Sequence, residues 1–187
     1  MALKRINGHW IGGGAALEVI TEDAANSYVG IAQATPMVAL DVVHDYDSAT
    51  FEAQLSDNEG GGDVLRYGTG TLTAGKLYFL QTDASWVLAD ADAVTTGGEQ
   101  LLGFALGTDP ATDGMLLRGF CKVASGNITG TPVIGAPVYL STTGGGVTFT
   151  APTATGDIVR SVGRCVDVDT GDILLLLSVS PEHVELA

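Results

Sequence analysis

Three aspartates near the C-terminus have the type and spacing of metal ligands. Asp167, Asp169 and Asp172 lie in the segment DVDTGD, and carboxylates that alternate in a short loop are typical of calcium sites. The segment lacks the glycine and the closing glutamate of an EF-hand loop. A second turn, TDPATDG, keeps Asp109 and Asp113. Both segments also fit ordinary Asp/Gly turns, so we predict that the chain has no metal site.

Histidine chemistry has little support along the chain. The segment VVHDYD puts His44 beside Asp45 and Asp47, but neighbours on one strand face opposite ways, which favours a solvated strand end. His9 and His183 lie near the termini without local partners. The sequence contains no HExxH, CxxC, GxSxG or P-loop motif. We therefore expect no catalytic residues, no cofactor and no enzyme activity, although a Ser/His/Asp site assembled from distant segments stays open.

Composition narrows the class of protein and its partners. The chain has 187 residues, with 45% hydrophobic residues, 26 glycines and only 16% charged residues, which is typical of a turn-rich, globular β protein. Its 22 acidic and 8 basic residues give a net charge of −14, so we expect no nucleic-acid partner. The longest apolar run, ILLLL, is far shorter than the ~20 residues of a membrane-spanning helix, so we expect no membrane partner.

Residues 1–65 and 66–187 differ in character. The first part is an N-terminal arm, small and rich in glycine and alanine, followed by a β-region of uncertain fold. Within it, residues 49–56 alternate apolar and polar side chains, which predicts a half-buried strand. The segment DNEGGGD, residues 57–63, predicts a boundary or a hairpin tip.

A repeat of 60 residues organises the second part. Shifting the sequence by 60 residues aligns Gly75 with Gly135, and the alignment continues without a gap until Gly103 is aligned with Gly163. Further identities within it are Leu80 and Leu140, Thr82 and Thr142, Val87 and Val147, Ala91 and Ala151, and Thr95 and Thr155. Past this frame, the loss of two residues in the turn aligns Met115 with Ile173.

The repeat predicts an all-β fold, a small barrel or sandwich built from two β-units at about 70–124 and 130–180. Each unit has too few strands to close a core alone, so we expect the two to pack together. Glycine is expected where a strand bends or a neighbouring backbone comes close. Cys121 and Cys165 lie in apolar strand-like runs and are expected to be buried free thiols. Trp86, with Tyr78 and Phe79, predicts a cross-strand contact in the core, with carbohydrate binding as the alternative.

The first unit, AGKLYFLQTDASWVLADADA…GEQLLGFALGTDPATDGMLLRGF, resembles the small β-barrel domain of tailed-phage capsid decoration (cement) proteins. The shared order is a Gly-led strand, a polar hairpin, a GxA strand, an Asp/Gly turn and a last apolar strand. The second unit, GAPVYLSTTGGGVTFTAPTATGDIVRSVGRCVD, similarly resembles segments of phage head-decoration and fibre proteins. The likeness covers residues 68–180 and its motifs are structural.

This resemblance implies a non-enzymatic virion protein, made in the host cytoplasm, that binds the capsid exterior and stabilises its lattice. Its partners would be the major capsid protein and further copies of itself, with a homotrimer implied by the family. An oligomer is also expected because GDILLLLSV is apolar on both strand faces and needs two covers. The alternative is a head or tail fibre segment that binds a host surface, and a glycan-degrading enzyme is a weaker third class.

The N-terminal arm carries the predicted capsid contact. Lys4, Arg5, His9 and Trp10 form the basic and aromatic patch of an otherwise acidic chain. An acidic body has little attraction for an acidic shell, so this patch would make the contact and become ordered on docking. The alternative is an N-terminal strand folded onto its own barrel or onto a neighbouring subunit.

Overall fold

The computed structural model describes residues 55–187 and five short strands that precede them, and the chain divides into two compact units, Met1–Tyr46 and Asp47–Ala187. The described strands of the first unit are β1 (Lys4–Ile6), β2 (His9–Ile11), β3 (Ile20–Asp23), β4 (Tyr28–Ile31) and β5 (Leu40–Val42). β1 pairs antiparallel with β2, and the other three form a sheet in the order β3-β4-β5. The strand predicted at residues 49–56 lies almost wholly outside the described residues.

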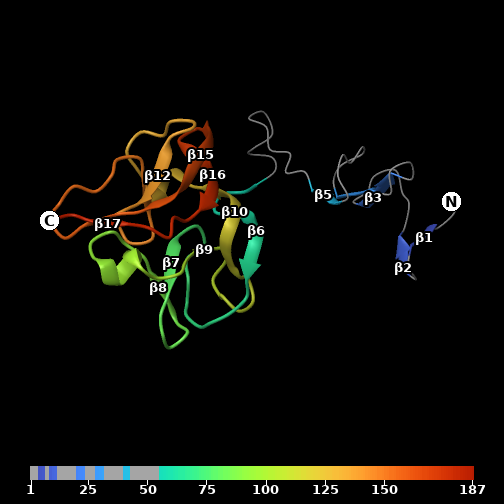
Figure 1. Cartoon of the computed structure of the whole chain (residues 1–187), viewed down its shortest axis with the longest axis horizontal. Coiled ribbons are helices and arrows are strands. Elements are labelled where there is room, and N and C mark those ends of the chain that lie inside the picture. The colour runs from blue at the N-terminus through green and yellow to red at the C-terminus, as the bar shows by residue number, and fades with distance from the viewer. Residues whose placement is uncertain (1–3, 7–8, 12–19, 24–27, 32–39, 43–54) are drawn as a thin grey trace. The chain divides into compact units, whose positions relative to one another are not determined.

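The second unit is nearly all β, which confirms the predicted fold class (Figure 1). Its strands are β6 (Gly60–Leu65), β7 (Leu77–Leu80), β8 (Trp86–Leu88), β9 (Leu102–Ala105), β10 (Met115–Val123), β11 (Ile128–Thr129), β12 (Pro137–Leu140), β13 (Val147–Thr148), β14 (Ile158–Val159), β15 (Ser161–Asp169), β16 (Asp172–Ser178) and β17 (Val184–Glu185). Its helical parts are a π-helical turn at Val94–Gly98 and a 3-10 turn at Ser125–Asn127. No helix within the described ranges is long and apolar enough to cross a bilayer.

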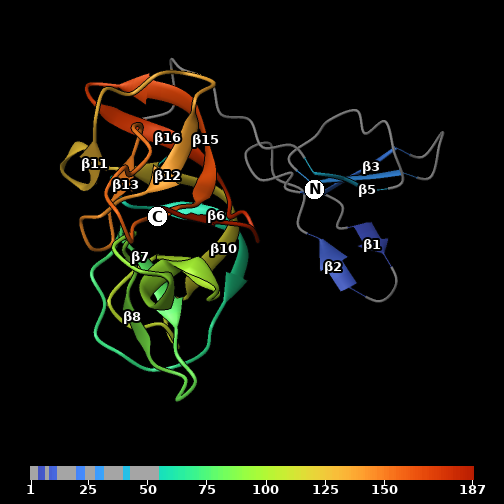
Figure 2. The ribbon, with the colours of Figure 1, turned by 60° about the vertical axis from the view of Figure 1, so that its left-hand side comes forward.

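The main sheet repeats its strand order about a central pair. The order is β11-β13-β12-β15-β16-β10-β9-β7-β8, and β6 is a further partner of β10. Reading outward from the antiparallel β10–β16 pair, β9, β7 and β8 on one side correspond to β15, β12 and β13 on the other. Figure 2 shows the second repeat (orange and red) above the first (green). The unit is therefore a duplicated β structure, as the 60-residue repeat predicts.

The cross-strand register of the inner ladders confirms the repeat. In the first repeat Tyr78 lies opposite Gly103, and in the second Val138 lies opposite Gly163, a shift of 60 at both positions. The ladders next to the central pair agree, because the pair Ala105 and Met115 corresponds to the pair Cys165 and Leu175.

The alignment of Met115 with Ile173 is therefore wrong, since Leu175 takes the place of Met115. The two connecting segments have equal length, but the second continues as a hairpin through a tight turn at Thr170 and Gly171, with φ 47° and 96°. Because residues 174–177 are all leucine, the sequence alone does not show which of them aligns with Met115.

One core spans both repeats. Its fully buried side chains include Leu77 and Phe104 from the first repeat and Leu140 and Leu175 from the second. The outer hairpins are joined by backbone hydrogen bonds, from Leu77 N to Gly145 O (2.9 Å), from Gly145 N to Ala89 O (2.7 Å) and from Ala91 N to Ser141 O (2.9 Å). The sheet thus curls into a half-barrel whose repeats cover one another.

The prediction of a boundary or hairpin tip at residues 57–63 is wrong for residues 60–63, which belong to a strand, whereas Asp57 and Asn58 form a turn. Gly60–Leu65 pairs with β10, and Gly62 lies opposite Gly119. Their φ angles are 146° and 143°, and a Cβ atom on either residue would overlap the backbone of the other strand. Glycine is used here for close strand approach rather than for chain termination.

The apolar run in β16 is buried by the chain itself. Ile173, Leu174, Leu175 and Leu177 are at most 1% exposed, and Leu176 is half-buried. The argument that a second copy must cover this run is therefore wrong, because one chain covers both faces of the strand at four of these five positions. The oligomer itself stays a prediction.

Alanine substitutions at the two equivalent glycines test the packing of the repeats. A Cβ at Gly163 would overlap the carbonyl oxygen of Leu176, whereas at Gly103 the nearest atom is the Met115 Cβ at 3.1 Å. We expect Gly163→Ala to lower the free energy of unfolding by about 3 kcal/mol and Gly103→Ala by about 1 kcal/mol. Urea denaturation measures both. Gly61→Ala is the matched control, since no described residue lies within 4 Å of its Cβ position, and equal losses at 163 and 103 would contradict the packing.

Candidate functional site

The predicted capsid-contact residues lie on a β-hairpin. Lys4 and Arg5 belong to β1, His9 and Trp10 to β2, and Arg5 lies directly opposite Trp10 in the ladder. Their side chains fall outside the described part of the structure. Their contact with a capsid stays a prediction.

The Asp/Gly turns use their carboxylates to bind backbone amides. Asp113 Oδ2 accepts hydrogen bonds from the amides of Thr108 (2.7 Å) and Asp109 (3.0 Å), and Asp109 Oδ1 accepts one from Ala111 (2.8 Å). Asp167 Oδ1 likewise accepts one from Val168 N at 2.9 Å. Among the residues that the structure describes, no group of three His, Cys, Asp or Glu side chains is placed to hold a metal ion.

The aromatic cluster of the first repeat belongs to the core, as predicted. Trp86 and Tyr78 are each 4% exposed and share a small apolar cluster. Trp86 Nε1 donates to Tyr67 O (2.8 Å), and the Tyr78 hydroxyl accepts from Thr73 N (2.8 Å). Both polar groups are satisfied inside the protein, so these rings are not a carbohydrate-binding surface.

Both cysteines are free and buried, as predicted. Burial raises the pKa of Cys165 to about 11 and raises that of Cys121 as well. A thiol with a raised pKa stays protonated at neutral pH, so neither side chain is an activated nucleophile.

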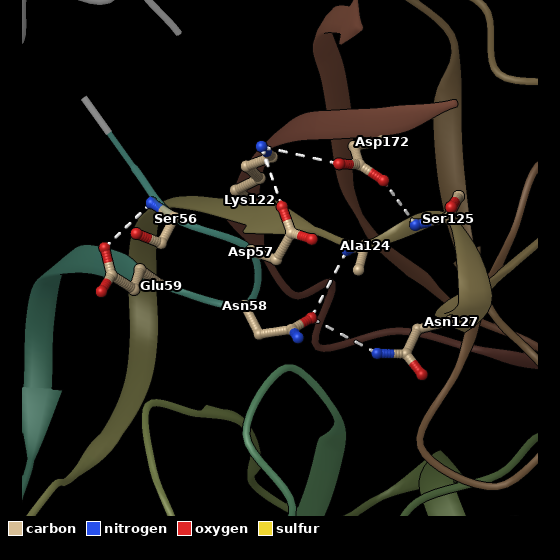
Figure 3. A network of polar contacts seen from close by, with 9 residues as sticks. All are labelled: Ser56, Asp57, Asn58, Glu59, Lys122, Ala124, Ser125, Asn127 and Asp172. Atoms are coloured by element: carbon tan, nitrogen blue, oxygen red, sulfur yellow. Dashed lines mark hydrogen bonds and ion pairs between the residues drawn. The ribbon is translucent and has the colours of Figure 1, made fainter. Parts of the chain in front are cut away.

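A buried lysine lies at one end of the central strand pair (Figure 3). The Lys122 side chain, in β10, is 4% exposed, and its Nζ lies 2.9 Å from Asp57 Oδ1 and 3.5 Å from Asp172 Oδ2. Asp172 Oδ1 also accepts a hydrogen bond from Ser125 N at 2.8 Å. The hydrogen bond from Lys122 holds the pKa of Asp57 below its ordinary value of 3.8.

The same region ties the segment before β6 to the end of β10. Lys122 exchanges backbone hydrogen bonds with this segment, accepting from Asn58 N (3.0 Å) and donating to Glu59 O (2.8 Å). Asn58 Oδ1 accepts from Ala124 N and from Asn127 Nδ2, both at 3.4 Å (Figure 3). We call this set of contacts around Lys122, Asp57, Asn58 and Asp172 the clasp; since its charges are paired, its role is structural.

A second buried cation, Arg160, lies beside an open pocket of about 470 Å³. The side chain is 5% exposed, with Nε donating to Ser180 O (2.9 Å) and Nη1 to Gly97 O (2.6 Å) and Gln100 O (3.0 Å). Burial lowers the pKa of its guanidinium. The pocket is lined by Leu101, Leu102, Leu117, Arg118, Arg160, Ser178, Val179 and Pro181.

The pocket lies where the two repeats meet. Arg118 and Ser178 line it and are register partners at one end of the β10–β16 ladder. Leu101 and Leu117 come from the first repeat, and Val179 follows β16 in the second. Sequence reasoning missed both buried cations, although each is a lone positive charge in an apolar strand-like run, CKV for Lys122 and DIVRSV for Arg160.

No protein-family model matches the chain, and a search of curated proteins finds no match. The class that the structure defines is therefore architectural: a duplicated, acidic half-barrel with a clasp at one end of its central strand pair and a two-arginine pocket at the other.

Breaking the clasp on one side tests its structural role. Asp172→Asn removes the less exposed of the two carboxylates that lie near the buried ammonium of Lys122, and we expect a loss of about 3 kcal/mol in the free energy of unfolding. Lys122→Met/Asp172→Asn should lose less, because no buried charge remains without its partner. Thermal and urea unfolding at neutral pH measure both. A double variant less stable than the single one would contradict this role.

Proposed function

We propose that this protein is a phage capsid decoration (cement) protein that binds the outside of the assembled head. One observation carries the proposal: the strand order of the first repeat follows the order of the resemblance. The Gly-led strand and hairpin are β7 and β8, the GxA strand is β9, the Asp/Gly turn holds Asp109 and Asp113, and the last apolar strand is β10. The second repeat supports it with the same ladder register.

The proposed mechanism is mass action on the shell. A protein that binds only the assembled lattice stabilises it against opening, by an amount set by its concentration relative to its dissociation constant. The contact is made by Lys4, Arg5, His9 and Trp10, since the rest of a chain with net charge −14 would be repelled by an acidic shell.

In this proposal the chain acts as a homotrimer in the virion, and one exposed apolar surface supports self-association. Val133 and Ile134 are 55% and 61% exposed, and Val166 is 39% exposed. The hydrogen bond from Gly135 N to Cys165 O joins the two segments that carry them. The two repeats differ next to this surface, because the Asn58 side chain packs on Gly75, whereas no described residue lies within 4 Å of the Cβ position of the equivalent Gly135.

Head binding is the test of function. Purified protein is added to heads that lack it, and bound copies and the temperature of head opening are measured. We expect the copy number to reach the hundreds, and Lys4→Ala/Arg5→Ala to weaken binding about tenfold or more. Arg66→Ala/Arg164→Ala removes the same number of charges elsewhere and should bind normally. About a dozen copies per particle would favour the fibre alternative, and absence of binding would overturn the proposal.

The mass in solution tests the oligomer separately. Light scattering at micromolar concentration should return three times the chain mass of 19.1 kDa. Ile134→Asp should shift the protein to monomer, because it places a charge in the exposed apolar surface. Glu182→Gln, at another exposed position, is the control. A wild-type monomer would contradict the trimer without bearing on head binding.

A further inference from the structure

The charge of Arg160 has no neutralising partner within the described residues. Its three hydrogen bonds all go to backbone carbonyls, which are neutral. No carboxylate in the described part of the chain lies within ion-pair distance of the guanidinium. Buried charges are costly unless they are paired, and the other buried cation, Lys122, has two carboxylates. Arg160 therefore differs from Lys122 in having no charged partner among the described residues.

Arg160 lines the pocket, and one nitrogen of its guanidinium, Nη2, makes no hydrogen bond to a described residue. Among the described residues, Nε and Nη1 donate hydrogen bonds and Nη2 does not. Nη2 is not among the buried polar atoms that lack a partner. Arg118, which is exposed and makes no hydrogen bond or ion pair with any described residue, lines the same pocket. The lining includes no aspartate or glutamate, although the chain has 22 acidic and only 8 basic residues.

The repeat indicates that the fold does not require a cation at this position. The shift of 60 residues places Gln100 at the position of Arg160 in the first repeat. The neutral Gln100 side chain thus precedes β9, the strand equivalent to β15. Its Oε1 is buried and accepts no hydrogen bond from a described residue. The positive charge is thus a feature of the second repeat and of the pocket, not of the shared architecture.

We propose that this pocket binds a carboxylate carried on a short aliphatic group. A guanidinium presents planar donors that match a carboxylate, and Ser178 supplies a further hydroxyl at the rim. Leu101, Leu117 and Val179 provide an apolar wall suited to a hydrocarbon tail rather than to a fully hydrated anion. Such a group can be the C-terminus of a peptide that ends in leucine or a free branched-chain acid.

The test titrates the full-length protein with 4-methylpentanoate and follows backbone amides by NMR. We expect saturable shifts at Leu101, Ser178 and Val179, and at least tenfold weaker binding of the neutral 4-methylpentanamide. Arg118→Gln should weaken binding about tenfold, whereas Arg164→Gln, an exposed arginine outside the pocket, should leave it unchanged. Arg160→Gln should abolish binding; if that variant does not fold, the Arg118 comparison and the amide decide the outcome.

Two further ligands separate the sources of the carboxylate. A short acetylated peptide ending in leucine with a free carboxylate is compared with the same peptide as a C-terminal amide. Tighter binding of the free-carboxylate peptide than of 4-methylpentanoate assigns the pocket to a chain terminus, and the reverse order assigns it to a small acid. Equal binding of acid and amide, equal binding of inorganic phosphate, or no shift at these residues would overturn the proposal.

Discussion

The antiparallel pairing of β10 with β16 is the interaction on which the rest of the second unit depends. Neither repeat has enough strands to enclose a core, and this ladder joins them so that each covers the other. The clasp and the pocket, the two polar features of the unit, lie at the two ends of this ladder. Lys122 lies opposite Leu174 near one end, and Arg118 lies opposite Ser178 at the other. The clasp and the pocket therefore exist only when the repeats are joined.

The two repeats differ at a few positions, and these positions form the clasp, the pocket and the exposed apolar surface. The first repeat gains β6, which needs glycine at positions 62 and 119 and brings Asp57 and Asn58 to the clasp. The second repeat has an arginine in place of Gln100 and leaves Ile134 exposed. Duplication thus supplies the packed core, and the departures from symmetry supply the clasp and the charged and apolar features of the surface.

Much of the architecture could be predicted from sequence, because the repeat preserves glycine and apolar residues at the positions where the ladder constrains them, as at Gly103 and Gly163. The strand at residues 60–65 could not, since three consecutive glycines disfavour a strand locally, and the close approach of β10 that accounts for Gly60 and Gly62 is visible only in the structure. The clasp could not either, because Asp57 and Lys122 are far apart in sequence. A lone arginine in an apolar run indicates a special position, but Gly97 and Gln100, which accept two of the three hydrogen bonds of Arg160, come from the other repeat.

Native-state hydrogen exchange tests the central claim, that the two repeats form one cooperative structure, most directly. The amides to compare are those of Phe79 in the first repeat, Val138 in the second and Cys121 in the central ladder, all of them in buried residues. The shared core predicts that all three exchange through the same opening reaction, with a free energy equal to that of global unfolding. Exchange of one repeat at a clearly lower free energy, while the other stays protected, would show that the repeats are independent and would contradict this account.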